Sequence, residues 1–368
     1  MRRQACTPRV DWQARLQAQG FDFHTIDGEP YWREDICYVF DAREIYEIEA
    51  ATNELHALCM EAVDRVVRDG RYEDLGLDAR AAALVERSWW DREPALYGRM
   101  DLVYDGSAPP RLLEYNADTP TALFEASVAQ WYWLQDVAPE ADQFNAIHEA
   151  LVERWRMLPP SSHVHFAACY DSSEDALTTD YLIDTCLQAG HRVTALDVEQ
   201  VGWSGRDFID MDNRPIDRLF KLYPWEWMLA EPFAMHLQGS PLRWIEPAWK
   251  MVLSNKAVLP LLWEFFPGHP NLLPASRRRG DLEGPVVRKP CWGREGAGVI
   301  VLQQGESESA TSERCIYQAF SPLPSYEGRH ALVGSWVVGD TAVGIGLRED
   351  EGLITRNTSC FVPHRFEG

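Results

Sequence analysis

The chain has 368 residues, of which 46% are hydrophobic, enough to bury a large core and to form two or three lobes. Its net charge of −22 argues against a nucleic-acid partner, because a phosphate backbone is bound by a basic surface. The acidity is compatible with a cationic substrate such as a polyamine, although it also favours solubility. Aromatic residues are abundant and suit deep clefts as well as a core: the sequence holds 15 Trp, 13 Tyr and 14 Phe.

The eight cysteines contain no Cys-x-x-Cys pair, so their spacing predicts neither a zinc site nor a disulfide framework. The N-terminal residues lack the apolar run of a signal peptide. The most apolar window, residues 257–266, is too short to span a bilayer and contains Glu264. We therefore expect a soluble, cytoplasmic protein with reduced thiols and no membrane partner. These features make no prediction of an oligomeric state.

Residues 1–160 are predicted to be mainly helical, and the clearest helices cover Glu44–Asp69 and Thr119–Val137. Residues 161–250 differ in character, because a strand, a helix and a second strand follow one another at Val164–Tyr170, Ser173–Ala189 and Arg192–Leu196. This βαβ pattern, with a further buried strand at 216–223, predicts a small parallel sheet. No Gly-x-Gly-x-x-Gly follows the first strand, so dinucleotide binding is not supported.

The region from about 251 to 368 is predicted to be rich in strands. They are expected at Gly284–Arg288, Gly298–Leu302, Arg314–Ala319, Leu332–Val338 and Thr341–Leu347. No internal repeat is present. The chain as a whole therefore mixes α+β and α/β patterns.

Two short segments near residue 100 concentrate oxygen donors beside a cation. Arg99 and Asp101 precede a predicted turn, and the returning strand carries Glu114 and Asn116. A hairpin brings Asp101 back towards Glu114 and Asn116, which share one face of their strand. Carboxylate and amide oxygens suit Mg²⁺ when phosphate and water complete its coordination shell. The segment predicts a magnesium site, although a hairpin of this composition is more often simply solvated.

The pair Thr119-Pro120 is typical of a helix start, with a capping hydroxyl followed by proline at the first helical position. The N-terminus of such a helix favours an anion beside the metal site, which indicates phosphate chemistry. At a spacing of three to four residues, the helix is expected to bury Leu123, Phe124, Ser127, Trp131 and Leu134.

A second group of candidate phosphate contacts lies in the last third of the chain. Lys289 ends an apolar strand and is followed by a loop, residues 291–298, that contains three glycines and Arg294. Such a loop lets backbone N–H groups approach phosphates closely, although glycine-rich turns are also common in structural roles. Lys256 lies near a predicted helix start, and the Gln318 amide has the donor and acceptor needed to read an adenine edge.

Five motifs occur in a fixed order along the chain. They are Arg-x-Asp at 99–101, Glu-Tyr-Asn-Ala-Asp-Thr-Pro at 114–120, Asn-Lys-Ala-x-Leu-Pro-x-Leu-Trp at 255–263, Lys-Pro-x-x-Gly-Arg-x-Gly at 289–296 and Ile-Tyr-Gln-x-x-x-x-Leu-Pro at 316–324. This order resembles the synthetase domain of the glutathionylspermidine synthase family, in a stand-alone form without the amidase half. The resemblance runs from about residue 11 to the C-terminus.

The resemblance implies an ATP-grasp fold with a circularly permuted chain order. Residues 1–160 together with 251–368 would form a composite ATP-grasp catalytic unit, and residues 161–250 a Rossmann-like pre-ATP-grasp substrate lobe. The chain leaves no room for an amidase domain, so hydrolysis of the product is not expected.

The resemblance also implies roles for individual residues, with ATP and Mg²⁺ as cofactors. Arg99 would contact ATP and steady the reacting phosphoryl oxygens, and Arg294 and Arg348 match further arginines near the active site. Thr119 takes the position of a hydroxyl that meets the carboxylate substrate. The implied Mg²⁺ ligands are Asp101, Glu114 and Asn116. The remaining implied ATP contacts are Lys256, Lys289, Gly296 and Gln318.

Substrate recognition is less well matched. Glu174 lies where the acidic pair that reads glutathione is only loosely matched, and no clear polyamine site is found. Lys221, just before the aromatic cluster at 223–227, is expected to face the substrate cleft. His163 and His165 alternate onto one face of a strand, but no third metal ligand accompanies them.

The sequence thus predicts an ATP- and Mg²⁺-dependent acid–amine ligase that forms an amide through an acyl phosphate. Its substrates would be a small-molecule or peptide carboxylate and an amine, with a polyamine among the candidates. Two alternatives stay open: a non-catalytic ATP-binding scaffold in a complex, and an ATP-dependent phosphoryl transferase. The intact metal ligands and the two lysines argue against the scaffold.

Overall fold

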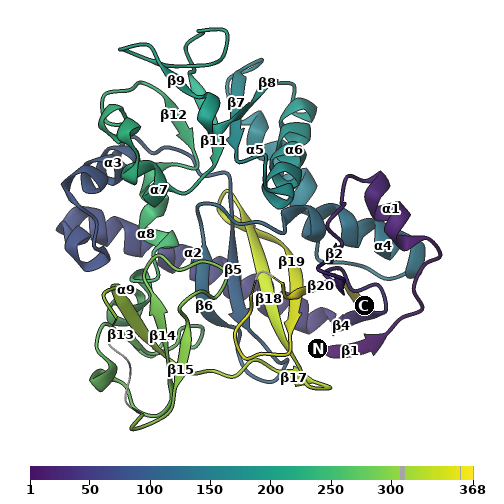
Figure 1. Cartoon of the computed structure of the whole chain (residues 1–368). Coiled ribbons are helices and arrows are strands. Elements are labelled where there is room, and N and C mark those ends of the chain that lie inside the picture. Colours follow the sequence, from purple (N-terminus) through teal and green to yellow (C-terminus); the bar gives the residue numbers. More distant parts are fainter. Residues whose placement is uncertain (307–310, 357, 368) are drawn as a thin grey trace.

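A six-stranded sheet occupies the centre of the molecule in the computed structural model, which describes residues 1–306, 311–356 and 358–367 (Figure 1). The neighbouring strands are antiparallel. In spatial order they are β20 (Cys360–Val362), β19 (Thr341–Asp350), β18 (Arg329–Val338), β5 (Tyr97–Val103) and β6 (Arg111–Asn116), with β17 (Ser325–Tyr326) paired to β18. The hairpin predicted near residue 100 is therefore confirmed as β5 and β6.

A parallel four-stranded sheet lies at the top of the view in Figure 1. Its spatial order is β12 (Arg243–Ile245), β11 (Arg218–Leu222), β7 (His163–Ala168) and β8 (Arg192–Asp197). Helix α6 (Ser173–Gln188) connects β7 to β8, and those two strands are parallel. The predicted βαβ unit and parallel sheet are confirmed.

Two further sheets complete the main architecture. An antiparallel sheet has the order β13 (Ala275–Ser276), β16 (Cys315–Ala319), β14 (Val286–Pro290) and β15 (Ile300–Leu302). The glycine loop, residues 291–298, joins β14 to β15 as predicted. A three-stranded sheet has the order β1 (Arg2–Ala5), β4 (Ile36–Asp41) and β21 (His364–Glu367), so both ends of the described chain pair with β4. Two short hairpins are β2 (Thr25–Ile26) with β3 (Glu29–Pro30), and β9 (Gly202–Trp203) with β10 (Phe208–Ile209).

The longest helix, α2 (Ala42–Asp69), packs behind the central sheet, and the Thr52 hydroxyl meets that of Ser335 on β18 at 2.8 Å (Figure 1). Asp41 caps its first turn by accepting from the Glu44 amide, while the Glu44 carboxylate accepts from the Asp41 amide. The other α-helices are α1 (Trp12–Ala18), α3 (Ala79–Trp90), α4 (Gln130–Val137), α5 (Ile147–Arg156), α7 (Trp225–Ala230), α8 (Met251–Ser254) and α9 (Val258–Phe265).

The predicted start of the helix at Thr119 is wrong. The helical run begins at Leu123 and passes through a π-helix, Glu125–Ala129, into α4. The chain stays out of the helix before Leu123 because Ala122 has a left-handed φ of 64°, and in this irregular segment the carbonyl of Thr121 accepts a hydrogen bond from Arg99. Of the residues expected to be buried only Trp131 is not, since it is 44% exposed.

Alternation along β5 separates the core from the polar face. Met100 and Leu102 are fully buried and pack with Tyr115 of β6 in the largest apolar cluster. Arg99 and Asp101 therefore project from the opposite face of the same strand. Among the residues that the structure describes, no helix is long and apolar enough to cross a membrane.

We expect Asp41→Ala to lower the free energy of unfolding by about 1 kcal/mol, because the first turn of α2 loses its capping oxygen. Urea denaturation measures the change. Asp41→Asn is the matched control, since asparagine retains a capping oxygen, and it should stay near the wild type. Equal stability of the alanine and wild-type proteins would contradict this role.

Candidate active site

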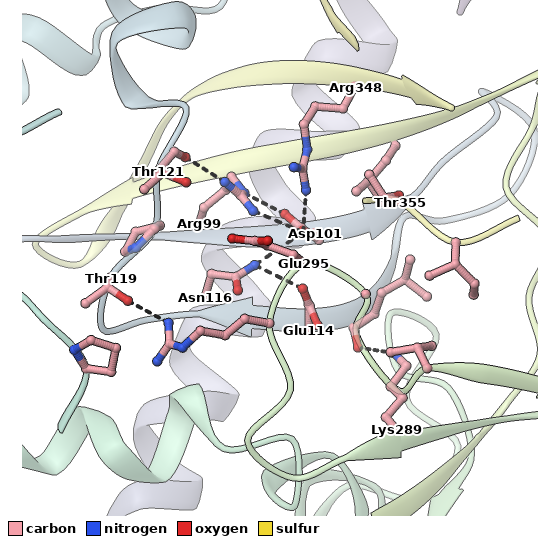
Figure 2. Close-up of a pocket in the computed structure, with 18 of the residues that line it drawn as sticks. Arg99, Asp101, Glu114, Asn116, Thr119, Thr121, Lys289, Glu295, Arg348 and Thr355 are labelled. Carbon is pink, nitrogen blue, oxygen red and sulfur yellow. Dashed lines mark hydrogen bonds and ion pairs between the residues drawn. The ribbon is translucent and has the colours of Figure 1, made fainter. Parts of the chain in front are cut away.

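A cavity of about 320 Å³ lies where the central, parallel and glycine-loop sheets meet, a size within the range of small-molecule sites (Figure 2). Side chains reach it from β5, β6, β14, β16, β19 and the start of α6. Of the residues predicted for the site, it is lined by Arg99, Asp101, Glu114, Asn116, Thr119, Glu174, Lys289, Arg294, Gly296, Gln318 and Arg348.

The pairing of β5 with β6 sets the polar centre of this cavity. Arg99 lies opposite Asn116 and Asp101 lies opposite Glu114. The Arg99 guanidinium donates to both carboxylate oxygens of Asp101, at 2.7 and 3.3 Å, and to the carbonyl of Thr121 at 2.7 Å. Arg99 is 8% exposed and Asp101 3%, so this ion pair is buried at the cavity wall.

Asn116 links the two carboxylates. Its Nδ2 lies 3.2 Å from Asp101 Oδ2 and 3.2 Å from Glu114 Oε1, so the three predicted metal ligands converge (Figure 2). In the described part of the chain, no group of three or more His, Cys, Asp or Glu side chains could hold a metal. This set has two carboxylates and one amide, and that composition suits Mg²⁺ bound jointly with phosphate and water. Ligation by Asn116 requires the amide to turn its oxygen towards the ion.

Two lysines approach the same carboxylate from the glycine-loop side. Lys256 Nζ lies 3.0 Å from Glu114 Oε2 and donates to the Gly293 carbonyl at 2.6 Å. Burial opposes ionisation of Glu114, but Lys256, Lys289 and the Asn116 amide lower its pKa to about 2. Burial, opposed by Glu114 and assisted by Lys256, lowers the pKa of Lys289 to about 8. A phosphate group entering this region meets cations that are already in place.

The Gln318 amide is engaged at both ends. Its oxygen accepts from Lys289 Nζ at 2.7 Å, and its nitrogen donates to the Leu112 carbonyl at 3.0 Å. Lys289 also donates to the Leu113 carbonyl at 2.8 Å. Gln318 lines the cavity as predicted, but in this arrangement it orients Lys289 instead of presenting a free amide edge to a base.

The glycine loop reaches over the cavity through Arg294. This side chain donates to the Thr119 hydroxyl at 2.8 Å and to the Glu226 carboxylate, and it lies 5.6 Å from the centre of the Trp227 ring. Gly296 has a φ of 71°, and a side chain there would meet the Thr355 carbonyl at 2.6 Å. Only glycine fits this close approach.

The wall formed by α6 is acidic. Glu174 and Asp175 line the cavity, and Glu295 of the glycine loop lies with them. Burial raises the pKa of Glu174, although Thr121, Arg348 and Arg99 oppose the shift. Burial and the charge of Glu174 raise the pKa of Asp175 to about 6. Arg348 lies across the cavity, with its guanidinium 3.8 Å from Asp101 Oδ2 (Figure 2).

Two predicted residues are not among those lining the main cavity. Lys256 lines a small neighbouring hollow and reaches the site through Glu114. The expectation that Lys221 faces the cleft does not fit the structure, because Lys221 is 1% exposed and its Nζ donates to Asp118 Oδ1 at 2.6 Å. Asp118 also accepts from the Trp225 backbone amide at 2.9 Å, so this pair ties the 114–120 segment to α7.

Other cavity residues were missed in the sequence. Glu295 follows Arg294 in the glycine loop. Its acidic side chain could have indicated a site residue, but it occupies a variable position of the Lys-Pro-x-x-Gly-Arg-x-Gly motif. Thr121 contributes a carbonyl, which no side-chain pattern indicates. Residues 353–355 follow β19 and have no motif, so only the folded chain places them at the cavity.

Comparison with known proteins matches residues 3–367 to a family model described as "Glutathionylspermidine synthase preATP-grasp". The chain belongs to the glutathionylspermidine synthase family. It is 41% identical to a Haemophilus influenzae protein named "Putative acid--amine ligase", over 97% of both chains. Its relatives bear the names of ligases and synthetases, and this family member is accordingly an enzyme of the ligase class.

Two larger relatives contain an additional region. The chain is 27% identical to the trypanothione synthetase of Crithidia fasciculata, covering 85% of this chain and 54% of that protein. It is 26% identical to the bifunctional glutathionylspermidine synthetase/amidase of Escherichia coli K12, covering 95% of this chain and 61% of that protein. The present family member thus spans somewhat more than half the length of these two relatives.

For this family member, we expect Lys221→Met to lower the free energy of unfolding by about 3–5 kcal/mol, because the Asp118 carboxylate remains buried without its cation. Chemical denaturation measures the loss. The double variant Lys221→Met/Asp118→Asn removes both charges and keeps an acceptor for the Trp225 amide. It should therefore recover much of the lost free energy of unfolding. A single variant as stable as the double one would show that the ion pair is not the cause.

Proposed function

We propose that the chain is an ATP- and Mg²⁺-dependent acid–amine ligase that forms an amide through an acyl phosphate. The observation that carries this proposal is the convergence of Asp101, Glu114 and Asn116 with Arg99 at one cavity wall, where Lys256 pairs with Glu114 from a small neighbouring hollow. Oxygen ligands and cations together favour chemistry on a magnesium-bound polyphosphate over catalysis by a covalent nucleophile of the protein.

The proposed reaction has two steps. In the first, a substrate carboxylate oxygen attacks the γ-phosphorus of ATP, the bond from that phosphorus to the bridging oxygen breaks, and ADP leaves. In the second, an amine nitrogen attacks the acyl carbon, inorganic phosphate leaves, and the nitrogen loses a proton. Negative charge gathers on phosphoryl oxygens in the first step and on the carbonyl oxygen in the second, so fixed cations lower both barriers.

Individual side chains suit these steps. Asp101, Glu114 and Asn116 would hold Mg²⁺, which neutralises phosphate charge when bound. Lys289, which donates to Gln318 and to the Leu113 carbonyl, would contact a phosphate group of ATP. Arg99 and Arg348 border the space beside Asp101, where the reacting phosphoryl group would lie.

The loop around Arg294 supports the substrate side of the proposal. Arg294 bonds to Thr119, the residue proposed to meet the carboxylate substrate, so a guanidinium and a hydroxyl are presented together. The acidic wall with Glu174 and Asp175 is suited to an ammonium group on either substrate. Glutathione and other small peptides are candidate acids, and polyamines are candidate amines.

The domain division is part of the same proposal. Residues 1–160 with 251–368 would form a circularly permuted ATP-grasp unit, and residues 161–250 a Rossmann-like substrate lobe. The parallel sheet of β7, β8, β11 and β12 supports the second part, since it falls within those limits.

The two alternatives predict different products. A phosphoryl transferase leaves a stable phosphorylated acid without any amine, and a scaffold binds Mg·ATP without releasing ADP. We therefore expect ADP release only when one carboxylate and one amine are supplied together. A grid of carboxylates crossed with amines, read by ADP release, tests this, and a stable phosphorylated acid or binding without turnover would overturn the ligase proposal.

We expect Asp101→Asn to abolish most of this ADP release, because it removes one carboxylate from the proposed Mg²⁺ site and a charge partner from Arg99. Titration of Mg²⁺ at fixed ATP measures the shift in the concentration that half-saturates the rate. Glu86→Gln, on the distant helix α3, is the matched control for loss of a carboxylate and should behave as the wild type. An unchanged Mg²⁺ dependence in Asp101→Asn would contradict the metal assignment.

We expect Arg99→Ala to lower turnover by about 10²–10³-fold, the usual cost of removing one well-placed cation or donor from a charged transition state. Steady-state ADP release is the measurement, with circular dichroism to show that the variant is folded. Arg192→Ala removes an exposed arginine from β8 and should leave turnover unchanged. A folded Arg99→Ala protein with normal turnover would refute the proposed role.

A further inference from the structure

Glu226 approaches the main cavity from behind. It lines the small neighbouring hollow, of about 20 Å³, and does not belong to the described lining of the main cavity. Its carboxylate accepts a hydrogen bond from Arg294 Nη2, while Arg294 Nη1 donates to the Thr119 hydroxyl at 2.8 Å. Arg294 and Thr119 both line the main cavity. Glu226 therefore reaches that cavity through Arg294.

The backbone that carries Glu226 is firmly held. Glu226 lies in the first turn of α7 and follows Trp225, whose side chain is fully buried. The Trp225 backbone N–H donates to Asp118 Oδ2 at 2.9 Å, and Asp118 directly precedes Thr119 in the chain. This hydrogen bond joins the neighbours of the two residues that hold Arg294. The Glu226 carboxylate and the Thr119 hydroxyl are thus fixed relative to each other.

The loop that carries Arg294 is permissive by comparison. Its backbone passes through the left-handed region at Gly296 and at Gly298, with φ values of 71° and 70°. Glycine adopts this region as readily as the ordinary one, so the sequence of the loop does not impose one conformation. The long arginine side chain also loses rotamer freedom when it is ordered. The contacts at its tip, with Glu226 and with the Trp227 ring at 5.6 Å, therefore decide where the guanidinium lies.

The pairing of Arg294 with Glu226 is incomplete. Among the residues that the structure describes, neither Arg294 Nε nor Glu226 Oε2 has a hydrogen-bond partner, although both atoms are buried. A guanidinium and a carboxylate that neutralise each other within a protein commonly share two parallel hydrogen bonds. Here one end of the guanidinium is held and one N–H group is left over. That arrangement suits a cation that is positioned for a ligand.

We propose that Glu226 is a positioning residue that holds Arg294, and with it the glycine loop, beside the Thr119 hydroxyl. The hold on the loop does not depend on the chemistry. Its consequence for catalysis rests on the proposed function, in which Thr119 meets the carboxylate substrate. A cation that is already in place spares the substrate the entropy cost of ordering the loop. Glu226 then lowers the KM for the carboxylate and takes no part in phosphoryl transfer.

Hydrogen exchange followed by mass spectrometry tests the hold on the loop without any substrate. Within the loop the Ala297 N–H donates to the Arg294 carbonyl at 2.8 Å, and a hydrogen bond of this kind slows exchange while the loop stays ordered. We expect Glu226→Ala to speed exchange in peptides covering residues 291–298 at least fivefold. Glu226→Gln keeps an acceptor oxygen and should lie between Glu226→Ala and the wild type.

Glu86→Ala is the control for this experiment, because it removes an exposed carboxylate from the distant helix α3, and its loop should exchange as in the wild type. Thermal melting of each variant, followed by circular dichroism, separates a local change in the loop from general unfolding. Wild-type exchange of residues 291–298 in Glu226→Ala would overturn the proposal.

Steady-state ADP release with the required acid and amine tests the consequence for the substrate. We expect Glu226→Ala to raise the KM for the carboxylate at least tenfold, with kcat and the KM for Mg·ATP within twofold of the wild type. Faster loop exchange with an unchanged KM for the carboxylate would overturn the role in substrate binding. If no pair of acid and amine supports turnover of the wild type, the ligase proposal fails, whereas the exchange experiment still decides whether Glu226 holds the loop.

Discussion

The antiparallel pairing of β5 with β6 is the constraint on which the rest of the site depends. It places Arg99 and Asp101 across from Asn116 and Glu114, and one residue of slippage would turn these side chains into the core. Met100, Leu102 and Tyr115 prevent that slippage because they fill the apolar cluster on the other face. The packing of the core therefore fixes where the charges lie.

Burying these charges costs free energy unless each has a partner. In this site the Asn116 amide is a hydrogen-bond partner of both carboxylates. Asp101 accepts hydrogen bonds from Arg99 and from the Asn116 amide. Glu114 accepts from the same amide and forms an ion pair with Lys256. Each cation that steadies a carboxylate here is also one that a polyphosphate could recruit. The ion pairs thus keep the proposed metal ligands and the cations beside them ordered around the same space.

The sequence predicted those parts of the molecule whose position depends on local pattern. The two-residue alternation gave the hairpin and the facing of Glu114 and Asn116, and the βαβ spacing gave the parallel sheet. The sequence-based predictions were wrong where contacts between distant parts of the chain determine the local structure. The Thr119-Pro120 signal for a helix start was overridden at Ala122, whose left-handed φ of 64° is incompatible with a helix. Lys221 was expected at the cleft, although its partner, Asp118, lies about a hundred residues earlier in the chain.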